Sequence, residues 1–192
     1  SMENRRISLI RKDLTVIPEC SFPDYIHTRL YIPGDEKLWV DIQTISDRYN
    51  SFDLQRFCKE FANDFQSLAE RQYYLFTKKN RPVGTATAWY ADNKKDGDCG
   101  LVHWVAILPE FQGKGLGKPL MTLLLKRMPQ LGHTQAKVNT NTVRIPAINL
   151  YLKFGFVPLI RDSSERKVWE KLKEKLPIAK QDFNLKNAYF SR

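Results

Sequence analysis

A glycine-rich, cationic loop between an apolar segment and a helical segment is the part of this sequence best suited to chemistry. Residues 105–118 read VAILPEFQGKGLGK, and the residues that follow have the pattern of a helix. Backbone N–H groups at a helix N-terminus, together with the helix dipole, bind phosphate oxygens. Glycine at Gly113, Gly115 and Gly117 lets the backbone adopt positive φ and approach a ligand without an intervening Cβ. The loop therefore predicts a site for a phosphate-bearing ligand.

Neither of the common nucleotide motifs accounts for this loop. Its glycines are spaced G-x-G-x-G rather than G-x-G-x-x-G, and no G-x-x-x-x-G-K-[ST] frame passes through them. The spacing that fits is Gln112-x-x-Gly115-x-Gly117, preceded by Ile107-Leu108-Pro109. A second motif, Asn149-Leu-Tyr-Leu-Lys-Phe-Gly-Phe, follows downstream.

With both motifs in this order and at a domain-like separation, the sequence resembles the GNAT superfamily of acyl-CoA-dependent N-acetyltransferases over residues 26–160. The resemblance implies an α/β fold of the α+β type, with a mixed, mostly antiparallel central sheet flanked by helices. It also implies an enzyme that uses acetyl-CoA as cosubstrate and transfers the acetyl group to a primary amine by direct attack in a ternary complex. The acceptor would be a small-molecule amine, a peptide N-terminus or a lysine. An ordinary glycine-rich turn is the alternative for the loop, and the second motif argues against it.

The resemblance also assigns roles to individual residues of the coenzyme site. The loop would hold the coenzyme A pyrophosphate, and the strand before it would bind the pantetheine arm and offer an N–H to the thioester carbonyl. Asn149 matches a frequent coenzyme contact. The predicted coenzyme-binding residues are Val105, Ala106, Ile107, Gln112, Gly113, Lys114, Gly115, Leu116, Gly117, Lys118, Asn141 and Asn149.

Tyr151 matches the family tyrosine that protonates the departing thiolate. A phenol with a pKa of ~10 can supply a proton to a thiolate whose conjugate acid has a pKa of ~8.5, with modest tuning. The alternative for Tyr151 is a half-buried helix residue with its hydroxyl in solvent. The surrounding motif favours the catalytic role.

His103 is the candidate general base. It lies on the predicted central strand, on the same face as Val105 and Ile107. A histidine stands at the same distance before the glycine loop in the arylalkylamine branch of the family, where it belongs to the proton path. Histidines titrate near ~6.5, which suits deprotonation of an ammonium at neutral pH. A structural histidine hydrogen-bonded to a backbone carbonyl is an equally good interpretation, and a water chain could supply the base instead.

The charges are distributed unevenly along the chain, whose formal net charge is +10. Residues 111–161 contain no Asp or Glu, whereas residues 35–70 contain eight. This acid-free segment includes the predicted coenzyme loop, where a positive field would raise the capture rate of a polyanion. A nucleic-acid partner is not expected, because the basic residues lie on the loop and helix assigned to the coenzyme. The main alternative function is a non-catalytic module that binds or senses acyl-CoA. A nucleic-acid-binding domain is a weaker alternative.

At 192 residues the chain suits one domain. We expect a polar, irregular lead-in over residues 1–25, an acetyltransferase domain over 26–176 and a basic tail over 177–192. We expect Ser1 and Met2 to derive from an expression vector. A monomer or a homodimer would suit this organisation.

The composition gives no sign of a membrane span, a signal peptide or a metal site. No apolar run approaches the ~18–20 residues that a membrane helix needs. The cysteines are odd in number, and neither they nor the scattered histidines have metal-ligand spacing. We therefore expect no metal cofactor, no membrane partner and a reducing, cytoplasmic location.

Apolar periodicity and turn residues predict the elements that must position these groups. The expected strands are 26–32, 73–77, 82–90, 100–107, 135–140 and 156–160. The expected helices begin at Asp35, at Ser51 or Asp53, at Leu116, at Pro146 and at Ser164. The second helix carries an apolar stripe that favours core packing over a substrate pocket, formed by Leu54, Phe57, Phe61, Phe65 and Leu68.

Overall fold

The computed structural model describes residues 3–177, 185 and 188–190. These residues fall into two compact units, each with its own core. Unit 1 takes residues from 1–18, 90–101 and 128–192, and unit 2 contains residues 19–89 and 102–127. Ser1, Met2 and most of the predicted basic tail lie outside the described residues.

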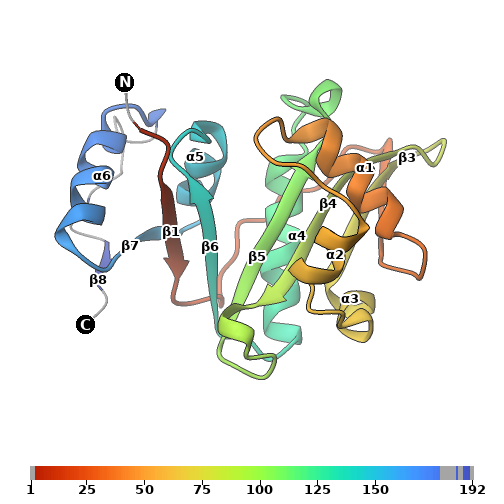
Figure 1. Cartoon of the computed structure of the whole chain (residues 1–192), viewed down its shortest axis with the longest axis horizontal. Coiled ribbons are helices and arrows are strands. Elements are labelled where there is room, and N and C mark those ends of the chain that lie inside the picture. Colours follow the sequence, from red (N-terminus) through yellow and green to blue (C-terminus); the bar gives the residue numbers. More distant parts are fainter. Residues whose placement is uncertain (1–2, 178–184, 186–187, 191–192) are drawn as a thin grey trace. The chain divides into compact units, whose positions relative to one another are not determined.

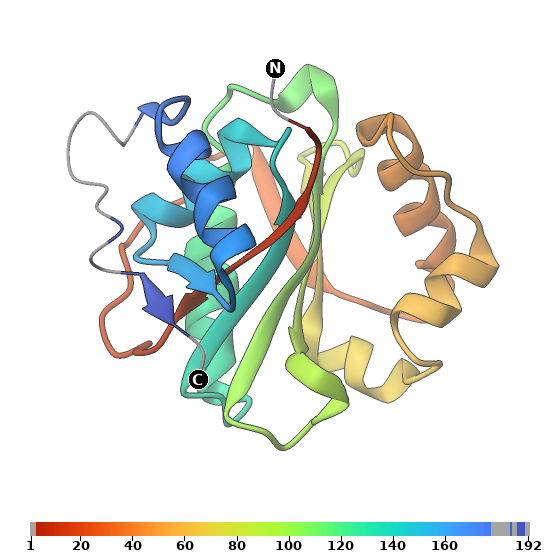
Figure 2. The same ribbon diagram turned by 60° about the vertical axis from the view of Figure 1, so that its left-hand side comes forward.

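Unit 2 is a layered α/β structure that carries the glycine loop. Its strands are neighbours in the order β2 (Ile26–Leu30), β3 (Gln72–Thr77), β4 (Pro82–Tyr90) and β5 (Cys99–Ile107), of which Tyr90 and residues 99–101 fall in unit 1. The helices α1 (Glu36–Ser46), α2 (Leu54–Glu60) and α3 (Phe65–Arg71) lie on one side of these strands, and α4 (Gly117–Gln130) lies on the other (Figures 1 and 2). The β5 strand thus runs between a helical layer on each face.

Unit 1 has its own group of strands, in the order β6 (Gln135–Asn141), β1 (Arg6–Arg11), β7 (Val157–Ile160) and β8 (Tyr189–Phe190). Its helices are α5 (Ile145–Lys153) and α6 (Ser163–Lys173). The described pairings of β1 with β6 and β7, and of β3 with β2 and β4, are antiparallel, whereas β7 and β8 are parallel. This confirms the predicted mixed, mostly antiparallel α/β fold.

The expectation of irregular structure over residues 3–25 is wrong, because Arg6–Arg11 forms β1 between β6 and β7. Ile7, Leu9 and Ile10 are buried there. The flanking arginines and the intervening Ser8 gave this short segment a polar composition. Pairing on both edges, which depends on distant parts of the chain, makes it a strand.

The single helix expected after Ser51 is also wrong, because the chain forms α2 and α3 with a break between them. Ala62 and Asn63 adopt positive φ of 52° and 54° there. Each helix has its own cap: the Asp53 side chain accepts from the N–H of Arg56, and Asp64 accepts from a residue in the first turn of α3. The apolar stripe therefore belongs to two helices, whose Phe57, Phe61 and Leu68 are buried while Leu54 and Phe65 are exposed.

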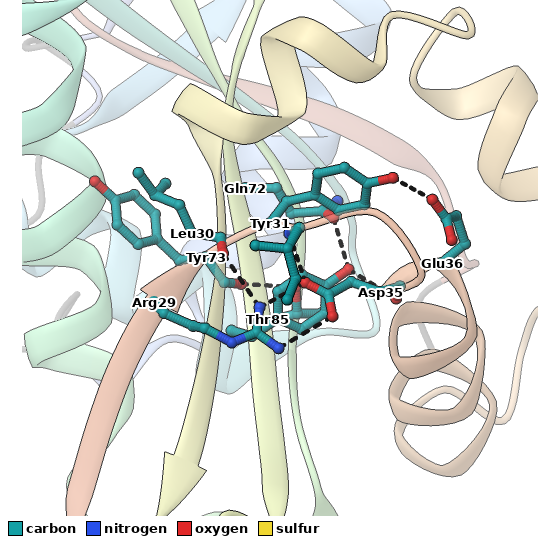
Figure 3. A network of polar contacts seen from close by, with 10 residues as sticks. Arg29, Leu30, Tyr31, Asp35, Glu36, Gln72, Tyr73 and Thr85 are labelled. Carbon is teal, nitrogen blue, oxygen red and sulfur yellow. Dashed lines mark hydrogen bonds and ion pairs between the residues drawn. The ribbon is translucent and has the colours of Figure 1, made fainter.

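A buried polar network fixes the N-terminus of α1 to the sheet (Figure 3). Asp35, where the first helix was expected to begin, is the N-cap residue of α1, but its side chain makes no cap hydrogen bond. Its carboxylate instead pairs with Arg29 at 2.6 Å and accepts from the N–H of Ile32 at 2.8 Å. The fully buried hydroxyl of Tyr74 donates to Gln72 Oε1 at 2.6 Å, and contacts the Asp35 carbonyl at 3.2 Å. These bonds set where α1 begins over β2 and β3.

Candidate active site

Two of the three loop glycines, Gly113 and Gly115, have the positive φ that the sequence predicted; the prediction is wrong for Gly117, which is the first residue of α4 and has negative φ. Gly113 and Gly115 adopt φ of 74° and 78°, and a Cβ at either position would meet no atom within 4 Å. The loop therefore has open space beside its backbone. It leads directly into α4, whose first N–H groups have no acceptor within the helix.

The loop rests on the end of β5. The Gln112 side chain donates from Nε2 to the carbonyl of Ile107 at 2.9 Å. Leu116, at the far end of the loop, is buried, and its carbonyl accepts from the N–H of Leu120 at 3.2 Å. The glycines thus lie between two anchored ends.

The last acidic residue before the acid-free segment is neutralised by an arginine. Glu110 pairs with Arg81, and the hydrogen bonds from this guanidinium hold the pKa of the Glu110 carboxyl below its usual value. Arg81 and Lys114 both lie over the ring of Phe111, at 5.4 Å and 5.2 Å from its centroid. The approach to the loop is therefore dominated by positive charge.

Strand β5 contains a backbone irregularity at Trp104, which adopts a positive φ of 49°. A non-glycine residue in this region is strained by about 1–3 kcal/mol and persists only where its surroundings hold it. The Trp104 carbonyl accepts from Gln43 Nε2 of α1 at 3.0 Å, and Gln43 is buried. The Trp104 ring is held by Trp39 and Phe52, with centroid distances of 6.0 Å and 5.4 Å.

The irregularity changes which side chains share a face of β5. His103 contacts Phe61 at a centroid distance of 5.5 Å, and Trp104 contacts Trp39 of α1. Neighbouring strand residues ordinarily point to opposite faces. Here both rings meet the layer formed by α1, α2 and the residues that join them, so the alternation assumed for His103, Val105 and Ile107 is interrupted at Trp104.

His103 faces the end of α2. Its Nε2 lies 3.4 Å from the backbone carbonyl oxygen of Glu60 and 3.8 Å from the Glu60 carboxylate. The carbonyl contact is the one that a structural histidine was expected to make. The imidazole nevertheless keeps a side-chain exposure of 21%, so part of the ring is open to solvent.

Most of the acidic residues of segment 35–70 have structural roles. Asp35 and Glu36 belong to the network at the start of α1, and Asp53 and Asp64 cap helices. Arg56 Nε pairs with Glu60 Oε1 at 3.0 Å. These carboxylates are therefore occupied within the protein rather than gathered as a surface for a cationic acceptor.

Tyr151 lies on α5 in unit 1, where its side chain is 6% exposed. The alternative of a half-buried ring with its hydroxyl in solvent is therefore wrong. Burial raises the pKa of Tyr151 to about 12, and the charge of Arg144 offsets part of the rise. The ring packs at 6.0 Å from that of Phe156. Pro146 lies in the first turn of α5, in agreement with the predicted start of this helix, and Gly155 follows its end with φ of 84°.

The predicted site residues are divided between the two units. The loop, Val105–Ile107 and His103 belong to unit 2, whereas Asn141, Asn149 and Tyr151 belong to unit 1. Asn141 ends β6, and its carbonyl accepts from the N–H of Arg144 at 3.0 Å. Gln43 and Glu60, which contact Trp104 and His103, were not among the predicted site residues. The sequence signal for Gln43 is a polar residue on the side of α1 that also carries the buried Trp39 and Ile42.

Residues 3–177, 185 and 188–190 lack two kinds of feature. Within this part of the chain, no three His, Cys, Asp or Glu side chains gather into a group that could hold a metal ion. Over the same residues, no helix combines the length and apolarity needed to cross a bilayer.

Comparison with known proteins identifies the family. The sequence profile of the acetyltransferase (GNAT) family matches residues 39–156. A mycothiol acetyltransferase from Acidothermus cellulolyticus is 31% identical over 170 residues, which cover 79% of this chain and 51% of that protein. Another, from an Arthrobacter species, is 26% identical over 150 residues, covering 73% of this chain and 45% of that protein. The chain thus spans about half the length of these curated relatives.

Solved structures agree at the level of the fold. A GCN5-related N-acetyltransferase from Sphaerobacter thermophilus superposes with a TM-score of 0.67 at 16% identity, covering 81% of this chain and 48% of that one. A GNAT-family acetyltransferase from Colwellia psychrerythraea gives a TM-score of 0.60 at 12% identity, covering 82% and 55%. Since the family profile covers more than half of the sequence and the fold agrees, the chain belongs to the acetyltransferase (GNAT) family.

Proposed function

We propose that this protein transfers the acetyl group of acetyl-CoA to the primary amine of a small molecule, or of a peptide N-terminus or lysine. Family membership supports acyl transfer in general. The observation that carries the coenzyme assignment is the loop itself, with positive φ at Gly113 and Gly115 and open space beside both. The mycothiol acetyltransferase relatives favour a small-molecule acceptor.

The residues of the loop fit a pyrophosphate. Backbone N–H groups from Gly113 to Gly117 and the start of α4 would bind its oxygens, and Lys114 and Lys118 would add positive charge. Val105, Ala106 and Ile107 would bind the pantetheine arm, with Asn141 and Asn149 as further coenzyme contacts. When bound, acetyl-CoA supplies the activated acyl group.

The proposed reaction is a direct displacement with His103 as base and Tyr151 as acid. His103 takes a proton from the acceptor ammonium, and the lone pair of the resulting amine attacks the thioester carbonyl carbon. The C–N bond forms and the C–S bond breaks, so the electron pair of that bond leaves on sulfur. Tyr151 protonates the sulfur and regains a proton released by the acylated nitrogen, so that one N–H proton ends on the thiol.

A binding and turnover screen tests this function. Calorimetry with acetyl-CoA, followed by assays against amines, amino acids and peptides, should show binding and acetyl transfer. Binding without transfer to any amine would favour an acyl-CoA-sensing module instead. The proposal also includes a reducing, cytoplasmic environment, since Cys20, Cys58 and Cys99 are free thiols.

The first prediction concerns the loop: Gly115→Glu should abolish acetyl-CoA binding. The new side chain would occupy the open space beside the loop and add a charge that repels phosphate. Gly132→Glu is the matched control, because Gly132 also has a positive φ, 91°, with no atom within 4 Å of an added Cβ. Calorimetry should show affinity lost in the first variant and kept in the second. Unchanged affinity in a folded Gly115→Glu protein would remove the loop from the site.

A further inference from the structure

We propose that Glu60 is the positioning residue of the base: its carbonyl holds the Nε2–H of His103, and its carboxylate stabilises the charge that the ring gains. The proton from the acceptor ammonium is then taken at Nδ1. This inference rests on the proposed acetyl transfer and names the residue that prepares its base.

Two oxygen atoms of Glu60 lie near the same ring nitrogen of His103. Nε2 of His103 lies 3.4 Å from the Glu60 carbonyl oxygen and 3.8 Å from Oε2 of its carboxylate. A carbonyl oxygen and an ionised carboxylate can only accept hydrogen bonds. Together they favour the tautomer with hydrogen on Nε2, because the bond made by one ring nitrogen sets the state of the other. The basic lone pair is then on Nδ1.

The place of Glu60 in the fold adds to this effect. It is the last residue of α2, so its carbonyl belongs to the helix C-terminus, where partial negative charge favours a cation. Phe61, the next residue, contacts the imidazole edge to face, with an interplanar angle of 77°. The same turn of chain therefore holds the ring in place and supplies its negative environment.

Arg56 tunes the carboxylate. Its Nε pairs with Glu60 Oε1 at 3.0 Å, which leaves Oε2 as the oxygen nearer His103. Its guanidinium lies over the Trp104 ring at 5.1 Å from the centroid. From α2, Glu60 faces the imidazole directly and Arg56 acts on it through Glu60, while Phe61 and Trp104 contribute aromatic contacts. Arg56 therefore orients Glu60 and also weakens its negative field.

The proton step balances without any further reactant. The acceptor ammonium loses a proton to Nδ1, which gives a neutral amine and an imidazolium. The imidazolium carries N–H on both nitrogens, and its Nε2–H faces the two oxygens of Glu60. After the amide has formed and the product has left, the imidazolium returns its proton to water.

Two substitutions should move the pH dependence in opposite directions. Glu60→Gln removes the negative charge, so the acidic limb of kcat/KM should move to lower pH by about one pH unit, with about a tenfold lower plateau. Arg56→Gln removes the charge that weakens Glu60, so the acidic limb should move to higher pH. If the Arg56–Glu60 pair were only structural, the two substitutions would not shift the acidic limb in opposite directions. Glu170→Gln breaks another i,i+4 arginine–glutamate pair, Arg166–Glu170 at 3.4 Å, and should leave the profile unchanged.

An NMR titration of the His103 imidazole in the coenzyme-free protein gives a second readout that does not depend on turnover. The signal is identified by its loss in His103→Gln, and its midpoint should fall in Glu60→Gln and rise in Arg56→Gln. If both variants kept the wild-type midpoint and pH–rate profile, the proposed role of Glu60 would be overturned, while the proposed acetyl transfer would stand. A wild-type protein that binds no acetyl-CoA or transfers no acetyl group would instead overturn the proposed function. Should Glu60→Gln fail to fold by its melting curve, the Arg56→Gln shift decides the matter alone.

Discussion

At the scale of single residues, Tyr151, the proposed acid, is buried. Because burial raises its pKa to about 12, the phenol stays protonated throughout the neutral range, which is the form that a proton donor needs. The same rise makes it a weaker acid against a thiol with a pKa of ~8.5. Proton transfer from Tyr151 is therefore favourable only if the departing thiolate also lies in an apolar environment, because such an environment raises the pKa of the thiol as well.

Tyr151→Phe should lower kcat by about 10²–10³-fold, the usual size of a general-acid contribution. The ring and its packing against Phe156 are kept, so the melting temperature and the KM for acetyl-CoA should change little. Steady-state kinetics and a melting curve on the same preparation check both statements. Full activity would mean that the thiolate takes its proton from water, and joint loss of activity and stability would assign Tyr151 to the core.

At the scale of elements, the main feature is the irregular β5 strand held by α1. Trp104 is in a strained conformation, and the buried Gln43 side chain provides the hydrogen bond to its carbonyl. The polar network of Figure 3 fixes the start of α1, and so the position from which Gln43 reaches β5. The backbone groups of Val105 to Ile107 therefore depend on a helix distant in sequence.

Gln43→Leu should leave the Trp104 carbonyl without this donor and reduce the free energy of unfolding by about 1–3 kcal/mol. Since the thioester is expected to bind next to Trp104, kcat should fall more than the affinity for free coenzyme A. Urea unfolding, kinetics and calorimetry measure the three quantities. Gln55→Leu, on the exposed side of α2, is the control and should change none of them. A fully stable and active Gln43→Leu protein would show that the surrounding rings alone hold Trp104.

The sequence could predict the elements whose signals are local. Strands β2 to β7 and helices α4 and α5 lie close to their expected bounds, since turns, glycines and apolar periodicity mark them. The loop conformation at Gly113 and Gly115 follows from residue type alone. The α2–α3 break was missed because Phe57, Phe61, Phe65 and Leu68 keep one helical spacing across it.

The rest depends on contacts between distant segments. Strand β1 exists because β6 and β7 pair with it, and its composition alone is polar. The approach of Glu60 to His103 requires α2 to dock on β5, 43 residues further along the chain. The positive φ of Trp104 has no marker in the sequence, since an indole is an unfavourable residue for that conformation. The extent of the acetyltransferase domain, residues 26–176, stays a prediction.

At the scale of the whole molecule, the tyrosines make stability depend on alkaline pH. Burial is the main cause that raises the pKa of Tyr31, Tyr73, Tyr74 and Tyr151 above the ordinary value of 10.0. They occur in both units, so each core holds phenols that resist ionisation. Above pH 10 the unfolded chain can lose these protons while the folded protein keeps them.

The last prediction follows from this difference: the free energy of unfolding should be nearly constant between pH 8 and pH 9 and fall steadily as the pH rises past 10. The sign follows from linkage, because the folded state binds more protons than the unfolded state in this range, and stability then decreases with pH. For Tyr151, whose pKa rises from 10.0 to about 12, the free energy of unfolding should fall by an amount on the order of 3 kcal/mol once the pH exceeds both pKa values. The raised pKa of the Cys99 thiol, caused by burial, acts in the same direction from about pH 9.

Urea unfolding at intervals between pH 8 and 11.5, with tyrosinate absorbance recorded in parallel, measures this dependence. Tyr74→Phe removes one buried phenol, so its stability deficit relative to the wild type should shrink as the pH rises above 10. Tyr25→Phe, which changes a phenol with 37% exposure, is the control and should keep the wild-type slope. A free energy of unfolding that stays flat to pH 11, or a Tyr74→Phe deficit that does not change with pH, would mean that these phenols ionise inside the folded protein. The buried network around Asp35 and Gln72 would then admit charge, contrary to its hydrogen bonding at neutral pH.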